Sequence, residues 1–581
     1  MRIEEGFQPV PYAEGNPYTT DPVLPSLLKR LLPSQALTEV EKDLERFGNE
    51  VLTTLRDLCK LAEPPALSKG WRALKDVFQR EGIIGIFYER AYREHSRAYG
   101  FAKILLAVGD SEVIDCPLSM TDGVARVIEI MGTPALKRDI YPRLTSRDPA
   151  VAFTAGQWMT ERPGGSDVSR TETVATAVQE SASPYGQRHT LNGFKWFSSA
   201  TDSDVALALA RTGQPSDGSR GLSLFLIPLR IPLIRAPSEP RPSATTNNIF
   251  IHRLKNKVGT KTLPTAELSI EGADAYLVGT PNEGVKLITP VLNITRIHSA
   301  VASTGSLRKC LAIATAHSRG RAIRGGTQLL SDTPLHVAEL ARLHVLYRAL
   351  VHFVFGAVVL LGKSECGVAS EEELLRLRLL TPAVKAFAAD KACTAMEECM
   401  TTLGGEGYME ENGFGKCIQD AFAEKIWEGT ITVLALDLVR ANGKSAALNA
   451  FIAWANTVLS SCPASLGDFL SGPLGSLRSA LDVLADAYAA PIPPLVPRPA
   501  LFLFCHIASG LYLLEHAIWA HSTAEPTRET DVEVLRRWVT EGGLDVALEN
   551  VRRAKAAAGS RIQMDANIVY GRGSGTQGAR L

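Results

Sequence analysis

The sequence has no excess of charge of either sign, since 62 Lys and Arg residues balance 62 Asp and Glu residues. A chain without net charge has no overall field that would hold DNA or an anionic membrane. Residues 443–581, where a local basic surface would still be possible, also contain 12 basic and 12 acidic side chains by count. Because duplex binding requires a net basic face, we do not expect this protein to bind nucleic acid.

Close pairs of cysteines are also missing from the sequence. The chain has 9 cysteines, but none forms a CxxC pair or a Cys/His cluster with the spacing of a metal site. We therefore expect no bound metal. An odd number of scattered cysteines is typical of reduced thiols in an intracellular compartment.

The sequence also lacks the long uninterrupted apolar runs of membrane-spanning helices. The run 350–362 is shorter than the roughly 20 residues that cross a bilayer. The longer run 501–520 contains His506, Glu515 and His516. We interpret both runs as buried helices of a large core, and we expect no membrane span.

The hydrophobic pattern changes near residue 150. Residues 1–150 carry apolar side chains at three- to four-residue spacing, which predicts helices, and Thr38 with Glu41 predicts a capping box at the start of one helix. Residues 151–283 contain short alternating or β-branched segments that are separated by turn residues such as Asn192-Gly193. This second region is predicted to be a small β domain.

Long helices with a wide apolar stripe return after the β domain. Residues 284–442 are predicted to form a helical bundle. Residues 443–575 are predicted to add a further helical region, and residues 576–581 a flexible tail. The order of these regions predicts an α+β fold that is mostly α.

A glycine-containing motif, QWMTERPGGSD, occupies residues 157–167 at the entry to the β domain. Gly164 and Gly165 allow main-chain amides to approach an anion closely, and Ser166 adds a hydroxyl donor. Taken by itself, the motif fits a glycine turn before a strand equally well.

A second motif, NGFKWFSSATDSD, occupies residues 192–204. In a strand, Trp196 and Phe197 point to opposite faces, so that one ring serves the core and the other flanks a flat ligand. In isolation, a core strand with two aromatic residues is the simpler interpretation.

The third motif joins LGGEGY to AEKIWEGTITV. Gly404 and Gly405 are predicted to end a long helix. Glu428 lies between Trp427 and Gly429, just before an apolar helical pattern. Its position is compatible with a helix-capping carboxylate that the helix dipole stabilises, and with a base whose pKa is raised by apolar and aromatic neighbours.

Together, and in this order, the three motifs resemble those of the acyl-CoA dehydrogenase family. The family forms are T-E-P-x-A-G-S-D, N-G-x-K-x-W-I-[ST]-N, L-G-G-x-G-[YF] and [YW]-E-G-T. Here they stand as T-E-R-P-G-G-S-D, N-G-F-K-W-F-S-S-A, L-G-G-E-G-Y and W-E-G-T. The resemblance runs from the N-terminal helices to about residue 442. The K-W-F-S and I-W-E-G-T variants and the extra C-terminal region look more like the AidB-type branch of the family.

The resemblance implies the acyl-CoA dehydrogenase fold, with an N-terminal helical domain, a central β-barrel domain and a C-terminal helical bundle, plus the extra helical region. It also implies an FAD cofactor bound between the β domain and the bundle. The residues implied to contact this FAD are Gln157, Trp158, Met159, Thr160, Gly165, Ser166, Phe197, Ser199, Trp427, Gly429, Thr430 and Thr432.

In the family, a neighbouring subunit completes the FAD site. The resemblance therefore implies a homo-oligomer, a dimer or a tetramer, in which Arg321, Gly404 and Gly405 reach the FAD of a partner. The spacing around Arg321 departs from the family pattern, and Thr401 replaces the usual Gln before the glycine pair.

The family reaction implies that Glu428 abstracts the α proton of a small-molecule substrate while a hydride leaves the β carbon for flavin N5. The substrate is an acyl-CoA or a related carbonyl-activated compound, and Arg296 is its candidate contact. Two alternatives stay open: a flavin-dependent oxidase or monooxygenase of a biosynthetic pathway on the same scaffold, and an AidB-like DNA-associated protein with weak dehydrogenase activity.

The chain finishes with Ala579-Arg580-Leu581 after a Gly/Ser-rich stretch. This ending resembles the C-terminal address that peroxisomal import receptors read. We therefore expect a peroxisomal location, with the cytoplasm as the alternative.

Overall fold

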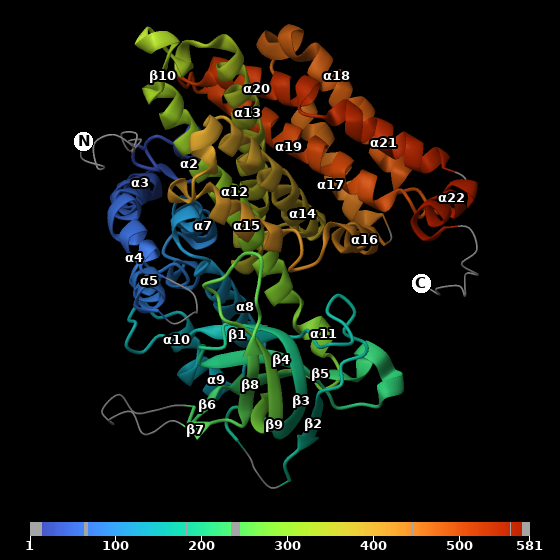
Figure 1. Ribbon diagram of the computed structural model, residues 1–581. Helices are drawn as coiled ribbons and strands as arrows, with labels where there is room; N and C mark the ends of the chain where they lie inside the picture. Colours follow the sequence, from blue (N-terminus) through green and yellow to red (C-terminus); the bar gives the residue numbers. More distant parts are fainter. Residues whose placement is uncertain are drawn as a thin grey trace. The chain divides into compact units, whose positions relative to one another are not determined.

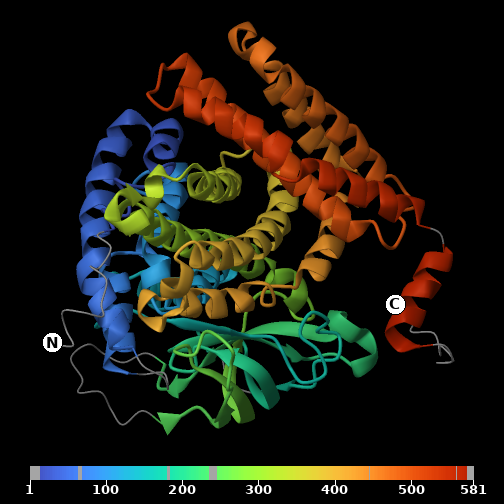
Figure 2. The same cartoon turned by 45° about the horizontal axis from the view of Figure 1, so that its top comes forward.

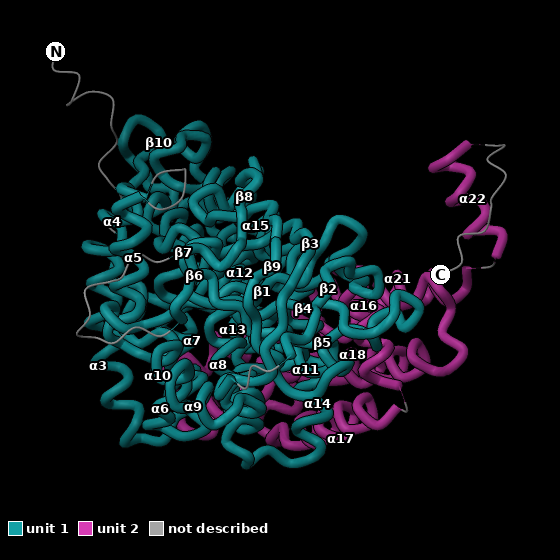
Figure 3. Tube along the Cα trace, turned by 90° about the horizontal axis from the view of Figure 1, so that it is seen from below, with its two compact units in different colours: residues 1–430 teal, residues 431–581 magenta. Residues whose placement is uncertain are grey.

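The computed structural model describes residues 14–62, 68–179, 183–233, 245–443, 445–557 and 559–571. The chain forms two compact units, residues 1–430 and residues 431–581 (Figure 3). The expected targeting sequence at Ala579-Arg580-Leu581 lies outside the described residues. The domain limits expected from the sequence stay a prediction.

The first part of unit 1 is helical. Its amphipathic helices bury one apolar face each, as Val40, Leu44 and Phe47 do in α3. The predicted capping box is wrong, because α3 begins earlier, at Ser34, and Thr38 lies inside it with its hydroxyl directed to the Ser34 carbonyl at 3.4 Å. The helices are α2 (Leu24–Leu31), α3 (Ser34–Glu50), α4 (Arg56–Lys60), α5 (Lys69–Arg80), α6 (Gly85–Glu89), α7 (Ser96–Ala107), α8 (Asp115–Met131), α9 (Pro134–Asp139) and α10 (Tyr141–Leu144).

A seven-stranded sheet follows, which Figure 1 shows at the lower end of unit 1. Neighbouring strands pair in the order β1-β4-β2-β3-β9-β5, and β5 pairs back onto β4, so that five strands close into a barrel-like ring. Strand β8 pairs with β9 at the edge. The strands are β1 (Ala155–Trp158), β2 (Val174–Ala177), β3 (Arg188–Ser199), β4 (Val205–Arg211), β5 (Leu222–Pro228), β8 (Ile249–Leu254) and β9 (Thr265–Leu277), with the small pair β6 (Arg230–Ile231) and β7 (Thr245–Thr246) beside them.

Strand β4 is buried on both faces, which explains its run of Val, Ala and Leu. Side chains alternate between two clusters because successive residues of a strand point to opposite faces. Val205, Leu207 and Leu209 pack in a cluster that includes residues of α8 and α9. The alanines between them pack inside the ring with Trp158 and Phe225.

The predicted turn at Asn192-Gly193 is wrong, because both residues lie inside β3. The pairing of β3 with β9 shifts register between Leu191 and Asn192, as at a β-bulge. A side chain at Gly193 would come within 2.3 Å of the Thr173 hydroxyl oxygen. The glycine therefore marks a close approach between β3 and the residue that precedes β2.

Long helices complete unit 1. Helix α12 contacts α7, α8, α13 and α14, and thus lies at the centre of the helical part (Figures 1 and 2). Helix α14 begins with a capping box in which Ser370 and Glu373 each bind the other's main-chain amide. The elements are α11 (Gly284–Leu287), α12 (Thr289–Gly320), β10 (Ala322–Ile323), β11 (Gln328–Leu329), α13 (Pro334–Glu365), α14 (Glu371–Thr401) and α15 (Phe414–Glu424).

The described residues of unit 2 are mainly helical, and α19 packs against α16, α17, α18, α20 and α21. The helices are α16 (Ile431–Asn442), α17 (Ala446–Ser460), α18 (Ala464–Ala487), α19 (Pro497–Ser522), α20 (Arg528–Glu541), α21 (Leu544–Ala556) and α22 (Gly559–Tyr570).

Two helices of the described residues, α13 and α19, are long and apolar enough to cross a membrane by length and composition. Their apolar windows are 72% and 83% buried inside the protein. Buried core helices pass the same test, so these two helices do not indicate a membrane span.

Candidate active site

Glu428 lies in the connection between α15 and α16, with its main chain in the left-handed region at φ +57°. Thr295 of α12 donates to Glu428 Oε2 at 2.7 Å, and the Arg296 guanidinium donates to the Glu428 carbonyl at 3.3 Å. Lys385 of α14 donates to the next carbonyl, that of Gly429, at 2.7 Å. A left-handed non-glycine residue costs roughly 1–3 kcal/mol. Contacts from two long helices therefore hold a strained turn that presents this carboxylate.

Burial raises the pKa of the Glu428 carboxyl above its ordinary value, although the Thr295 hydrogen bond and the charges of Arg296 and Lys385 oppose this rise. A carboxylate with a raised pKa is a stronger base, while the charges of Arg296 and Lys385 favour its ionised form. The geometry therefore supports the base that the third motif predicts. The capping role is not supported, because the residue is in the left-handed region and α16 begins only at Ile431.

Replacing Thr295 with Val should move the acid limb of the catalytic pH profile upward. The hydroxyl stabilises the anionic form of Glu428, so its loss raises the pKa of the base further. The rate should fall most at acidic pH. It should change little at pH values well above the acid limbs of the wild type and the variant. The pH dependence of flavin reduction measures this shift, and an unmoved acid limb would show that Thr295 does not tune the base.

The first two motifs lie side by side. The Lys195 ammonium bonds the Glu161 carboxylate at 2.6 Å, and the Trp196 amide donates to the Thr160 carbonyl at 3.0 Å. The Trp158 indole donates to the Ser199 carbonyl at 3.0 Å. Residues about forty positions apart in the sequence thus form one surface at the ends of β1 and β3.

The same surface is joined to the helix that precedes Glu428. The Ser199 hydroxyl lies 3.0 Å from the Thr265 hydroxyl, to which Lys257 donates at 2.9 Å. Three positions after Lys257, the main-chain amide of Thr260 donates to the Asp420 carboxylate of α15 at 2.5 Å. The third motif is thus anchored to the β domain, as a site between the β domain and the helices requires.

The residues at this surface fit a flat ligand with polar edges. Phe197 is 55% exposed, although it lies within β3, where most residues are buried or half-buried. Gln157 Oε1 and Ser198 Oγ are buried and have no hydrogen-bond partner among the described residues. Gly165 and Ser166 are exposed beside Thr160. An exposed ring, unpaired polar atoms and an open glycine turn suit a flavin ring and its phosphates.

Trp158 lies in the core of the barrel. The residue is 1% exposed, packs inside the strand ring and donates its indole hydrogen to the Ser199 carbonyl. Its implied contact with FAD stays a prediction. Met159 is partly buried against the cluster between the sheet and α8, and Thr160 is half-buried at the surface that the two motifs share.

Within one chain, Arg321 lies far from the Glu428 turn. It follows the C-terminal end of α12, 26 positions after Thr295, which is about 39 Å along a helix that rises roughly 1.5 Å per residue. Gly404 and Gly405 are exposed beyond the end of α14, with Gly404 at φ +64°. The contribution of these residues to a second subunit's site stays a prediction.

The remaining predicted residues flank Glu428 in the sequence. Trp427 and Gly429 are half-buried and Thr430 is exposed. Thr432 is in unit 2, where its hydroxyl accepts a bond from Arg498 at 3.4 Å. The predicted contacts of these residues with FAD are untested.

Sequence reasoning missed Lys385 and Glu424 as members of this site. Glu424 has a sequence signal, because it lies four positions before Glu428 and its neighbours in that segment are largely apolar. Lys385 interrupts the apolar stretch TPAVKAFAA, and this interruption is the sequence signal that could have identified it. Burying an unpaired charge within an apolar helix costs free energy. A lysine at such a position therefore indicates a structural or catalytic role.

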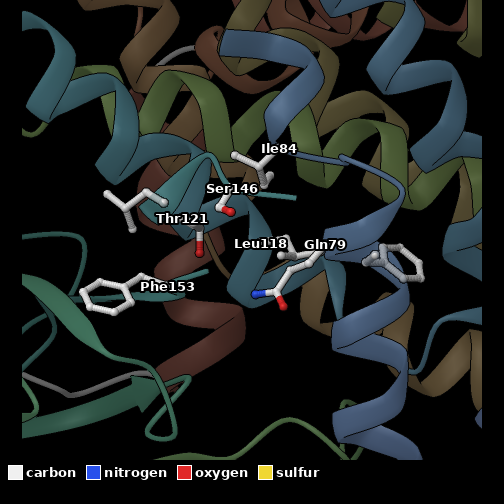
Figure 4. Close-up of a pocket in the computed structure, with 8 residues that line it drawn as sticks. Gln79, Ile84, Leu118, Thr121, Ser146 and Phe153 are labelled. Atoms are coloured by element: carbon white, nitrogen blue, oxygen red, sulfur yellow. The ribbon is translucent and has the colours of Figure 1, made fainter. Parts of the chain in front are cut away.

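A small pocket elsewhere in unit 1 contains none of the predicted site residues (Figure 4). It lies between α5, α8 and the segment before β1, with Gln79, Leu118, Thr121 and Phe153 in its wall. Gln79 Oε1 is buried there without a partner among the described residues. The pocket is thus separate from the surface that the motifs form.

The fold is that of the acyl-CoA dehydrogenases. Residues 156–273 match the family model of the acyl-CoA dehydrogenase middle domain, and residues 282–442 match that of the C-terminal domain. The chain is 36% identical to acyl-CoA dehydrogenase family member 11 of Caenorhabditis elegans, over 96% of this chain and 91% of that protein. It therefore belongs to the acyl-CoA dehydrogenase family.

The crystal structure of C. elegans ACDH-11 in complex with C11-CoA superposes with a TM-score of 0.87 at 35% identity, and covers 98% of each chain. This likeness confirms the predicted fold class, including the extra C-terminal helices. The putative acyl-CoA dehydrogenase AidB of Escherichia coli is 27% identical over 65% of this chain and 66% of that protein. The comparisons thus do not confirm the predicted AidB-type branch.

Membership of the family determines the type of enzyme and its cofactor. The protein is an oxidoreductase of the acyl-CoA dehydrogenase type, and FAD is the cofactor of this family. The residues at the motif surface fit that cofactor, as shown above.

Proposed function

We propose that the protein removes two hydrogens from an acyl-CoA thioester and yields the 2-enoyl-CoA, with Glu428 as the base that takes the α proton. The observation that carries this proposal is the half-buried Glu428 carboxylate, which the Thr295 hydroxyl orients and whose anion the charges of Arg296 and Lys385 favour. Bound FAD supplies the acceptor for the hydride that leaves the β carbon. Arg296 donates to the main-chain carbonyl of Glu428 and therefore lies beside the proposed base.

The proposed substrate class rests on one solved structure that the chain resembles along almost its whole length. ACDH-11 was crystallised with C11-CoA, and 98% of each chain is covered in that comparison. We therefore propose that this protein accepts an acyl-CoA of about that length. The AidB-type branch, the oxidase or monooxygenase alternative and the DNA-associated alternative stay predictions.

Anaerobic mixing of the FAD-loaded protein with acyl-CoAs tests the proposal. C11-CoA and its shorter and longer homologues should bleach the flavin absorbance, whereas the corresponding free acids should not. A flavin that no acyl-CoA bleaches would contradict the proposed reaction. Bleaching by free acids as well would show that the CoA moiety is not required.

We also propose that a second copy of the chain completes the FAD site. This is supported by the exposure of Arg321, Gly404 and Gly405 and by the helix length that separates Arg321 from Thr295. The peroxisomal location stays a prediction.

A further inference from the structure

The connection between β8 and β9, residues 255–264, is tied to the surface that the first two motifs form. The Lys255 ammonium lies 3.2 Å from the centre of the Trp196 ring in the second motif. Lys257 donates to the Thr265 hydroxyl at 2.9 Å, at the start of β9. The position of the connection is therefore fixed relative to the residues of the second motif.

Two main-chain contacts dock the same connection on α15. The Thr260 amide donates to Asp420 Oδ1 at 2.5 Å, while Lys416 of α15 donates to Asp420 Oδ2 at 2.8 Å and orients the carboxylate. Gly259 is buried, and a side chain there would come within 2.0 Å of the Gln419 carbonyl oxygen. The main chain of the connection therefore lies directly against that of α15, at a separation that requires glycine.

Thr260 is held in an unfavourable conformation. Its φ of +52° lies in the left-handed region, which is a genuine outlier for a β-branched residue. Such a conformation persists only where surrounding contacts over-determine it. Here the contacts are the bond from the Thr260 amide to Asp420 and the bond from the Thr262 hydroxyl to the Glu112 carbonyl at 2.8 Å. Contacts to two other segments therefore maintain this geometry.

Helix α15 connects Asp420 to the proposed base. Asp420 lies one turn before Glu424, the last residue of α15, and eight positions before Glu428. The Ser299 hydroxyl of α12 donates to the Glu424 carboxylate, which fixes the end of α15 on the helix that also carries Thr295. A displacement of α15 at Asp420 would therefore be transmitted to the turn that presents Glu428.

We propose that Asp420 is a positioning residue which, through the Thr260 amide, holds the Glu428 turn in a fixed place relative to the surface that the first two motifs form. Proton and hydride transfer depend steeply on geometry, and a displacement of about 1 Å can lower a rate by about 100-fold. The catalytic part of this role rests on the proposed function, whereas the hold of Asp420 on the turn does not.

Hydrogen exchange of the FAD-loaded protein without substrate tests the hold on the turn. In Asp420→Ala, the amides of residues 256–263 and those of residues 425–430 should both exchange about tenfold faster, because local opening needs less free energy once the contact is lost. The control is Asp57→Ala, at an exposed position of α4, which should leave both segments unchanged. Faster exchange confined to residues 256–263 would overturn the proposal, whatever the protein does with acyl-CoAs.

Flavin reduction at saturating acyl-CoA tests the catalytic part. Asp420→Ala should lower the rate by about tenfold or more, while the affinities for FAD and acyl-CoA stay within about threefold, because the bonds of Asp420 are to the protein itself. Asp420→Asn keeps a neutral acceptor for the Thr260 amide and should recover part of the lost rate. If FAD-loaded Asp420→Ala reduces its flavin as fast as Asp57→Ala does, Asp420 does not position the base.

Gly259→Ala perturbs the same contact from the other side. The added methyl group would meet the Gln419 carbonyl, so that α15 and the connection must move apart, and the variant should show the same lower rate and faster exchange as Asp420→Ala. Gly467→Ala in α18 is the matched control, since an added side chain there meets nothing within 4 Å. A normal rate and normal exchange in Gly259→Ala would contradict the proposal.

Discussion

The Glu428→Gln variant should retain bound FAD and lose reduction of the flavin by acyl-CoA, with a rate about 100 to 10,000 times lower than that of the wild type. Glutamine has nearly the same shape and keeps an oxygen that accepts the Thr295 hydrogen bond, but it takes no proton. The turn at φ +57° should survive the change, since the main-chain bonds from Arg296 and Lys385 do not involve the carboxylate. Rapid-mixing absorbance of the flavin under anaerobic conditions measures the loss.

The matched control for this prediction is Glu397→Gln, the same chemical change at an exposed position of α14. Its rate of flavin reduction should equal that of the wild type. Binding of the enoyl-CoA product should be similar in all three proteins, since the variant alters proton transfer and not the pocket. A Glu428→Gln variant that reduces its flavin at a normal rate would remove Glu428 as the base.

The sequence was sufficient to predict the elements whose signal is local. The alternation of DVALALAR and LSLFLIP predicts strands, and the structure has β4 and β5 at these positions. The motif around Glu428 could also be recognised from the sequence, because few structural roles require a carboxylate between Trp427 and Gly429. In both cases the pattern depends on residues that are neighbours in the chain.

Features that depend on distant residues could not be predicted. Asn192-Gly193 has the composition of a turn, but pairing with β9 and the close approach of Thr173 make it part of a strand. Trp158 lies in a motif that the family uses for FAD, yet its ring is drawn into the barrel core. Lys385 joins the site only because α14 packs against α12, an arrangement that no local pattern specifies.

The Glu161–Lys195 ion pair gives the second large expected effect, since Lys195→Met should destabilise the protein by about 3–5 kcal/mol. The two side chains are 2% and 0% exposed, and Lys195 also donates to the Leu209 carbonyl at 2.8 Å. Removing the ammonium leaves a buried carboxylate without its cation. The loss should also disturb FAD binding, because Glu161 follows Thr160 and Lys195 precedes Trp196 in the two motifs that form the flavin surface. Thermal unfolding and flavin retention after gel filtration measure both effects.

The control for this prediction is Arg188→Met on the same strand, which removes a cation from the partly exposed Arg188–Asp274 pair. A pair of that kind contributes about 1 kcal/mol or less. The double variant Glu161→Gln/Lys195→Met should regain part of the stability lost in Lys195→Met, because it leaves no unpaired buried charge. If Lys195→Met is no less stable than Arg188→Met, the ion pair does not hold the two motifs together, and the hydrogen bonds from Trp158 and Trp196 must do so instead.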